Sequence, residues 1–205
     1  MTGTTMTDAL EALREGKPVV MPFDTVYGLA ADPSREEPVR RLYKLKGRGE
    51  AEPSALVAWD FAYLLECVPE LRGDAASLAQ VLLPGPVTLI LPNPARRFRW
   101  LTGTNPEAIG VRVPAFDGPG AEVLERVGAV AATSANHPGG RDPKRLDEVP
   151  EEIRKGAGAL VDGGELPGSP STVIDLTGEK PRILREGALP AEEALRRLDA
   201  AVRSG

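Results

Sequence analysis

The sequence has little of the chemistry on which many enzymes depend, because it contains one histidine, His137, and one cysteine, Cys67. A single cysteine excludes an internal disulfide, and one residue of each type cannot complete a structural zinc site or a Cys-His nucleophilic pair. A Ser-His-Asp triad would have to use His137, which lies between Asn136 and Pro138 in a loop rich in glycine and proline. We therefore interpret His137 as an exposed loop residue without a catalytic role.

Two familiar phosphate-binding signatures are absent as well: no stretch reads G-x-x-x-x-G-K-[ST], and no G-x-G-x-x-G follows an expected strand. Aromatic residues make up only 4% of the chain and its net charge is −5, which argues against a protein that binds nucleic acid over most of its surface. Local basic clusters remain, one formed by Arg40, Arg41, Lys44, Lys46 and Arg48 and the other by Arg96, Arg97 and Arg99. Either cluster could face phosphate groups, and for the second we favour a solvated surface.

The first residues, 1–8, have neither a basic start nor an apolar stretch. We therefore expect a cytoplasmic protein that does not enter a membrane. The 205 residues are 41% hydrophobic, which is enough for one sizeable core, and we expect a single domain over 1–205. The 20 prolines and 22 glycines are spread between apolar runs, as expected of loops in a folded protein.

Hydrophobic patterning predicts a chain in which strands recur throughout and helices separate only some of them. Helices are expected over 7–15, from about 34 to 45, and over 60–66, 74–83, 120–127 and 191–202. Strands are expected over 18–21, around 24–30, and over 54–59, 87–91, 109–113, 129–132, 159–161, 172–176 and 182–184. This order indicates an α/β protein with a twisted mixed sheet flanked by helices.

Two local features are expected to shape the region before Lys46 and Arg48. Gly28 is able to adopt a backbone conformation closed to other residues. Ser34, with Glu37 three residues later, forms the pattern of a capping box that begins a helix. The C-terminal end of that helix carries Lys46 and Arg48.

Seven short polar segments lie at the edges of the apolar runs. In chain order they are Pro22-Phe23-Asp24-Thr25-Val26-Tyr27-Gly28, Lys46-Gly47-Arg48, Pro84-Gly85-Pro86-Val87-Thr88, Val111-Arg112-Val113-Pro114, Thr133-Ser134-Ala135-Asn136, Ser171-Thr172-Val173-Ile174-Asp175 and Leu184-Arg185-Glu186-Gly187. Each segment alone favours a structural interpretation such as a helix end, a cap or an ion pair.

Together and in this order, the segments resemble the YrdC-like family of threonylcarbamoyl-AMP synthases over residues 7–190. The chain length is similar to that of the single-domain form of the family, in which 191–202 would be a C-terminal helix. The resemblance implies a YrdC-like fold with a positively lined central cavity. It also implies a nucleotidyltransferase that makes threonylcarbamoyl-AMP and diphosphate from L-threonine, bicarbonate and ATP, for modification of tRNA.

By position in the family pattern, Thr25, Arg112 and Ser171 resemble threonine-binding residues, while Ser134 and Asn136 resemble ATP-binding residues. The transfer reaction needs cations where negative charge develops on the phosphates. Lys46 and Arg48 can supply these cations and are the expected catalytic and ATP-binding pair. Arg185 is expected to make a third contact with ATP. We expect no metal site made by the protein itself, and a Mg²⁺ ion held mainly through the ATP phosphates and water. An attacking carboxylate needs no general base, in agreement with the scarcity of histidine.

The sequence departs from the family pattern at five positions. Phe23 stands where threonine is usual, Gly49 where proline usually follows the arginine, and Glu52 near a usual asparagine. Val57 lies near a position often held by a threonine-contacting histidine, and Asp142 where an ATP-contacting serine is common. We expect these differences to affect the substrate pocket and to leave the fold unchanged.

Two other functions remain open. One is a paralogue of the same fold that binds a nucleotide and acts on another small molecule, although the intact segments at Lys46 and Ser134 count against it. The other is a non-catalytic module that binds structured RNA. As partners we expect the three small substrates, a threonylcarbamoyl transferase that accepts the product, and no membrane, and we leave open direct binding of tRNA or double-stranded RNA.

Overall fold

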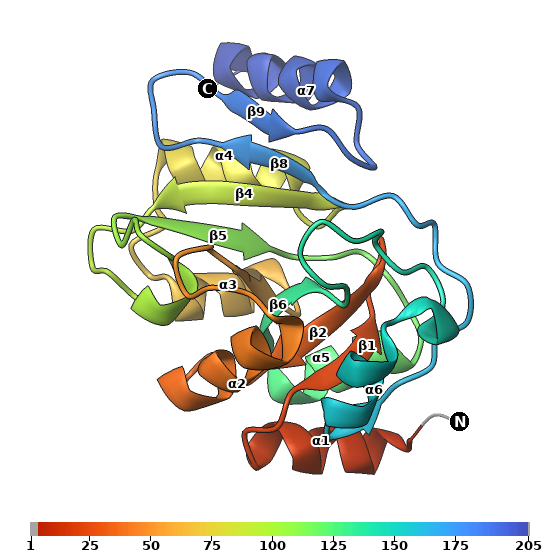
Figure 1. The fold of residues 1–205 in the computed structure, drawn as a ribbon. Helices are drawn as coiled ribbons and strands as arrows, with labels where there is room; N and C mark the ends of the chain where they lie inside the picture. The colour runs from red at the N-terminus through yellow and green to blue at the C-terminus, as the bar shows by residue number, and fades with distance from the viewer. Residues whose placement is uncertain (1–3, 205) are drawn as a thin grey trace.

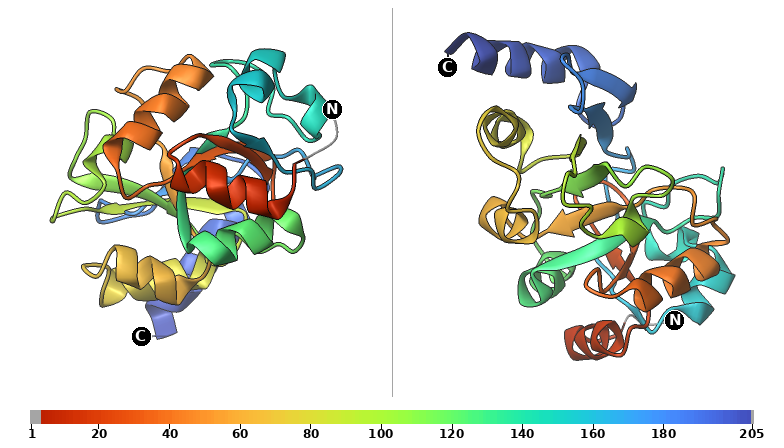
Figure 2. Two further views of the ribbon diagram at one scale, coloured as in Figure 1. Left: turned by 90° about the horizontal axis from the view of Figure 1, so that it is seen from below. Right: turned by 90° about the vertical axis from the view of Figure 1, so that its left-hand side faces the viewer.

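A computed structural model describes residues 4–204 of the chain. Within these residues, nine strands form one sheet in the order β7-β1-β2-β6-β3-β5-β4-β8-β9 (Figure 1). Three neighbouring pairs, β1 with β7, β3 with β5 and β4 with β8, run parallel, and the other five are antiparallel. The sheet is strongly twisted, with helices packed around it (Figure 2), which confirms the predicted mixed α/β architecture.

The strands are β1 Val19–Pro22, β2 Tyr27–Ala31, β3 Ala55–Ala58, β4 Val87–Pro92, β5 Ala108–Arg112, β6 Ala129–Ser134, β7 Ala159–Leu160, β8 Thr172–Asp175 and β9 Arg182–Arg185. The α-helices are α1 Met6–Arg14, α2 Glu36–Lys46, α3 Phe61–Cys67, α4 Asp74–Leu82, α5 Pro119–Val127, α6 Glu151–Gly156 and α7 Ala191–Ser204. Two 3-10 helices, η1 Arg99–Leu101 and η2 Leu146–Glu148, complete the described part.

Alternating side chains place two hydrophobic clusters against the sheet, because successive residues of a strand point to opposite faces. In the larger cluster, side chains such as Leu42 of α2, Leu64 of α3 and Leu89 of β4 are fully buried. In the smaller cluster, Val130 of β6 packs with buried residues of α5, among them Leu124. Helix α1 and helix α7 lie at opposite ends of the molecule, near the two edge strands β7 and β9 (Figure 1).

One sequence-based expectation about the region before the site was wrong. Ser34 does not cap α2, because its backbone N–H and its hydroxyl both donate to Asp32, and the helix begins after Arg35 without a side-chain cap. Gly28 does not use the positive φ that a glycine allows. It lies within β2, and a Cβ there would lie 2.5 Å from the ring of Phe23, so the position requires glycine for close packing.

Sequence patterns also missed three short helical elements, η1, η2 and α6. None exceeds six residues, so their hydrophobic periodicity is too short to recognise. None of the helices within residues 4–204 has the length and apolar character needed to cross a membrane.

Candidate active site

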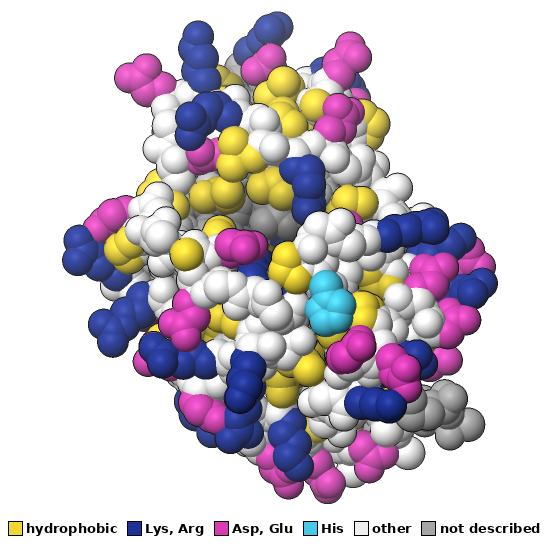
Figure 3. Space-filling model, viewed as in Figure 1, with side chains coloured by type: hydrophobic (Ala, Val, Ile, Leu, Met, Phe, Trp, Pro, Cys, Tyr) yellow, Lys and Arg dark blue, Asp and Glu magenta, His cyan; other side chains and the backbone are white. Residues whose placement is uncertain are grey.

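A cavity of about 330 Å³ lies on one face of the sheet, over the strands between β2 and β9. Figure 3 shows the hollow, with hydrophobic side chains around it and charged side chains at its rim. Its floor contains small residues, including Ala55, Ala108, Gly110 and Ala132, which leave space above the strands. A few polar groups converge on this apolar floor, as is typical of binding sites for small molecules.

The strand register brings distant polar residues into one row on the cavity floor. Val57 of β3 pairs with Arg112 of β5, and Thr88 of β4 pairs with Val173 of β8. Val173 in turn pairs with Arg185 of β9. Leu89 pairs with Val111, so Thr88 lies next to Arg112 and completes the row.

One end of the row is built around Arg112, whose side chain is 11% exposed. Its Nη2 donates to Oδ1 of Asp24 at 2.6 Å and to the hydroxyl of Thr25 at 3.3 Å. Burial lowers the pKa of Arg112 and raises that of Asp24, while the attraction between the two charges opposes both shifts. The buried Nε of Arg112 has no hydrogen-bond partner within the described part of the chain, which leaves a donor for a ligand.

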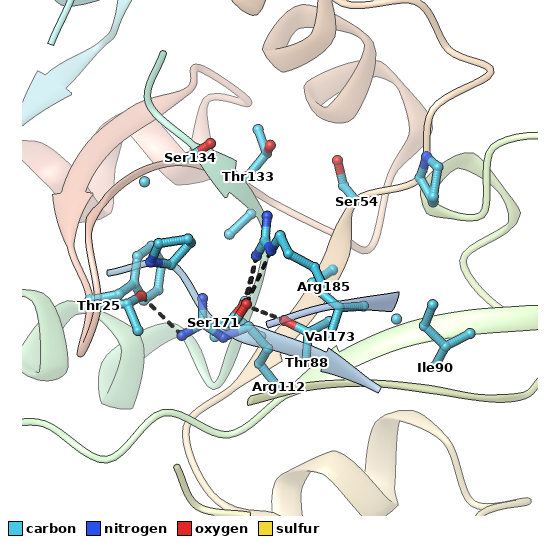
Figure 4. Close-up of a pocket in the computed structure, with 18 of the residues that line it drawn as sticks. Thr25, Ser54, Thr88, Ile90, Arg112, Thr133, Ser134, Ser171, Val173 and Arg185 are labelled. Atoms are coloured by element: carbon cyan, nitrogen blue, oxygen red, sulfur yellow. Dashed lines mark hydrogen bonds between the residues drawn. The ribbon is translucent and has the colours of Figure 1, made fainter. Parts of the chain in front are cut away.

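The other end of the row joins Thr88, Ser171 and Arg185 (Figure 4). The Ser171 carbonyl accepts hydrogen bonds from Nε and Nη2 of Arg185, at 3.2 and 2.8 Å, and the Ser171 hydroxyl accepts a third from Nη2 at 3.2 Å. The hydroxyls of Thr88 and Ser171 are 2.8 Å apart. These contacts fix the Arg185 guanidinium at the cavity, although it belongs to an edge strand.

Arg48 reaches the cavity from the opposite side, after Gly47 has ended α2 with a φ of 70°. Its Nη1 donates to the hydroxyl of Thr133 at 3.0 Å, and its Nη2 donates to the carbonyl of Pro53 at 2.5 Å. Its Nε also lies 3.0 Å from Oε2 of the exposed Glu52. The cavity therefore has three arginines, Arg48, Arg112 and Arg185, on its walls, and Asp142 is the one carboxylate among its described lining residues.

Lys46 and Asn136 are not among the residues that line the cavity; they form a buried network directly behind Ser134. The Lys46 ammonium donates to the Ser134 carbonyl at 2.6 Å, and to the carbonyl and side-chain oxygen of Asn136 at 2.9 and 2.8 Å. The Asn136 amide donates to Gly140 and Asp142. Burial, followed by the charge of Arg48, lowers the pKa of Lys46 to about 8.

The structure thus brings six of the sequence-predicted residues to one cavity: Thr25, Arg48, Arg112, Ser134, Ser171 and Arg185. Further polar residues at the site had no role assigned from sequence, among them Asp24, Thr88 and Thr133. All three lie inside the seven segments that resemble the family, so proximity to assigned residues was the available signal.

The departures from the family pattern fall in different places. Phe23 and Val57 line the cavity, and the Phe23 ring lies 5.9 Å from the Arg112 guanidinium carbon. Asp142 also lines it, whereas Gly49 is exposed. Phe23 and Val57 therefore bear on the shape of the pocket beside Arg112, and Asp142 bears on its charge.

Two other charged features noted in the sequence, His137 and the second basic cluster, lie outside the cavity. His137 is half-exposed, with Nδ1 3.3 Å from the Lys46 carbonyl and Nε2 3.6 Å from Glu152. In the second basic cluster, Arg96 pairs with Glu107 and Arg97 pairs with Glu70. Both pairs are largely solvent-exposed, in agreement with a charged surface.

The twisted mixed sheet flanked by helices places the chain in the class of proteins with the YrdC fold. The family described as Sua5/YciO/YrdC, telomere recombination, matches residues 11–187, and the chain belongs to this family. The family matched is the one that the seven segments resemble.

Relatives and a solved structure agree with this assignment. The threonylcarbamoyl-AMP synthase of Pyrococcus abyssi is 39% identical over 184 residues, which cover 88% of this chain and 53% of that protein. The Bacillus subtilis protein of the same name is 31% identical, with 90% of this chain and 54% of that protein covered. The crystal structure of P. abyssi Sua5 complexed with L-threonine has a TM-score of 0.85 and 36% identity, covering 94% and 56% of the respective chains. The present chain therefore spans about half the length of these relatives.

Proposed function

We propose that this protein is a nucleotidyltransferase that joins L-threonine, bicarbonate and ATP into threonylcarbamoyl-AMP and diphosphate, for modification of tRNA. The observation that carries the proposal is the convergence of Arg112, Ser171, Arg185 and Arg48 on one cavity. The similarity to relatives named threonylcarbamoyl-AMP synthase, one of them solved with L-threonine, supports it.

Threonine binds at the Arg112 end of the cavity in this proposal. The guanidinium of Arg112 holds the α-carboxylate, and its unpartnered Nε provides one of the donors. The hydroxyls of Thr25 and Ser171 are available to polar groups of the substrate, although Thr25 is itself buried and already bonded to Arg112. Phe23 and Val57 supply apolar surface for the substrate methyl group.

The ATP phosphates face Arg48, Ser134 and Arg185. Arg48 and Arg185 lie at the cavity wall, where they stabilise negative charge that develops during transfer. Lys46 and Asn136 act through Ser134, because Lys46 donates to its carbonyl and Asn136 accepts from its hydroxyl, which holds Ser134 in place. The positive charge of Lys46 adds to the attraction for the phosphates even without direct contact.

The reaction has two steps. The threonine ammonium first loses a proton to water, and the neutral amine nitrogen forms a bond to the bicarbonate carbon. The bond from that carbon to its hydroxyl breaks, and the hydroxyl leaves as water with a second proton from the nitrogen, giving N-carboxythreonine. A carboxylate oxygen of this carbamate then forms a bond to the α-phosphorus of ATP, and the bond to the diphosphate oxygen breaks. The second step needs no proton acceptor, so the protein contributes orientation and charge stabilisation.

A Mg²⁺ ion, bound mainly through the ATP phosphates and water, belongs to the same proposal and would neutralise part of their charge. No group of three or more His, Cys, Asp or Glu side chains that could hold a metal occurs within residues 4–204. Asp142 is the carboxylate best placed to contact water around such an ion. We further propose a cytoplasmic location and a threonylcarbamoyl transferase as acceptor of the product; direct contact with tRNA or double-stranded RNA stays a prediction.

The decisive experiment is incubation of the purified protein with ATP, magnesium, bicarbonate and L-threonine, followed by mass detection of the adenylate and diphosphate. The proposal expects a product that requires all three substrates. Arg112→Gln serves as the site control because it removes the charge facing the threonine carboxylate. If ATP binds and no adenylate forms, the paralogue function replaces this one, and if only structured RNA binds, the RNA-binding module does.

A further inference from the structure

Thr88 lies at the middle of the row across the strands, and its hydroxyl has no role in the function proposed above. Its hydroxyl lies 2.8 Å from that of Ser171, which accepts a hydrogen bond from Arg185. Two hydroxyls hold two protons, and their mutual hydrogen bond uses one of them. One hydroxyl proton is therefore left over, next to the guanidinium of Arg185.

This donor pair lies between the two arginines of the row. Thr88 neighbours Arg112 across β4 and β5, and it is connected to Arg185 through Ser171 and through the register of β8 and β9. Burial lowers the pKa of Arg112, the charge of Asp24 opposes this shift, and the positive charge of Arg185 adds to it, as expected for two cations that face the same space. An anion between them would relieve their repulsion.

We propose that Thr88, Ser171 and Arg185 form a subsite for a small planar oxyanion, which is bicarbonate before the first step and the carbamate carboxylate of N-carboxythreonine after it. The inference rests on the proposed function, in which threonine binds at Arg112 and the phosphates face Arg48 and Arg185. The one-carbon unit must lie between them, because it becomes bonded first to the threonine nitrogen and then to the α-phosphorus. Thr88 occupies the corresponding place in the row.

The chemistry of the subsite suits a carboxylate. A guanidinium and a hydroxyl proton can donate to different oxygens of one planar anion, while Thr88 and Ser171 orient each other. The hydroxyl pair supplies no base and no nucleophile, because within residues 4–204 neither hydroxyl is hydrogen-bonded to a histidine or a lysine. Thr88 is thus a binding residue that positions the carboxylate oxygen for attack on phosphorus.

The test compares Thr88→Val, which keeps the branched shape and removes the hydroxyl, with Thr88→Ser, which keeps the hydroxyl. In steady-state diphosphate release we expect Thr88→Val to raise the KM for bicarbonate at least about tenfold, as for loss of a hydrogen bond to a charged group. The KM values for ATP and threonine should change less than about threefold, and Thr88→Ser should restore most of the bicarbonate KM. Thr177→Val, which removes a hydroxyl that donates to Asp175 outside the cavity, is the matched control and should leave the KM for bicarbonate unchanged.

A second measurement does not require turnover: the line width of ¹³C-labelled bicarbonate is titrated with wild-type and Thr88→Val protein. Broadening that depends on the Thr88 hydroxyl supports the subsite even if no adenylate forms, in which case the proposed function fails and the oxyanion site stands. If Thr88→Val is folded and both bicarbonate readouts match wild type, the subsite is refuted. A rise confined to the KM for ATP would assign the hydroxyl to a phosphate, and one confined to threonine would assign it to the amino acid; either result also overturns the proposal.

Discussion

Replacement of Lys46 by methionine tests whether its ammonium holds the segment at Ser134 and Asn136. Methionine keeps an unbranched apolar stem and removes all three hydrogen bonds that Nζ donates. Lys46 is 5% exposed, so water cannot readily replace the lost donor, and two backbone carbonyls and one side-chain oxygen lose a partner. A buried acceptor left unpaired costs about 1–3 kcal/mol.

Removal of the buried charge itself recovers part of this loss, because burying an ammonium costs several kcal/mol. We expect a net destabilisation of about 3 kcal/mol, which corresponds to a fall in Tm of roughly 6–12 °C for a chain of this size. Urea unfolding followed by circular dichroism measures the difference. Lys44→Met is the matched control, since Lys44 is an exposed lysine in the same last turn of α2, and it should change stability by less than about 0.5 kcal/mol. Equal stability of the two variants would refute the structural role of the Lys46 network.

Three further outcomes are expected. Arg48→Ala should reduce adenylate formation at least about tenfold in a diphosphate-release assay while the protein stays folded; full activity would remove Arg48 from the phosphates. His137→Ala should leave turnover and its pH profile unchanged, because the ring contacts the Lys46 carbonyl and Glu152 outside the cavity; a lost titration near neutral pH would contradict this. In adenylate yield at equal concentrations, threonine should exceed serine, which loses a methyl group worth roughly 1 kcal/mol, and serine should exceed valine, which leaves hydroxyl partners unpaired. A preference for valine would mean that Phe23 and Val57 have redefined the pocket.

The sequence predicts each strand within residues 4–204, because each contains apolar or branched residues and turn residues separate it from the next element. It does not predict which strands are neighbours: β6 pairs with β2 and β3, and β4 pairs with β8, through contacts far apart in the chain. A local hydrogen bond that the sequence did not reveal also made the prediction of a capping box wrong. Ser34 and Glu37 have the expected spacing, but the carboxylate of Asp32, two residues before Ser34, bonds to both its hydroxyl and its N–H.

The site shows the same division between local and long-range information. The type and order of the residues identified arginines that are suited to binding anions. The sequence could not show, however, that Arg48 lines the cavity and Lys46 does not. The left-handed Gly47 between them turns the chain, so that Lys46 stays in the helix and faces the carbonyls of Ser134 and Asn136, while Arg48 enters the cavity. Asp24 was missed as the partner of Arg112 for a related reason, because the two are 88 residues apart and meet only across the sheet.

The row across the sheet explains how short segments far apart in sequence can form one site with so few reactive side chains. Strand order places β3, β5, β4, β8 and β9 side by side, and register then puts one residue of each at the same level. Since side chains alternate along a strand, a shift of one residue in any pairing would turn Arg112 or Thr88 toward the hydrophobic core on the other face. The buried neighbours Val111 and Leu89 would then face the cavity, so the packing of the core fixes the register on which the cations depend. The hydrophobic core therefore determines the geometry of a site whose proposed chemistry relies on orientation and charge.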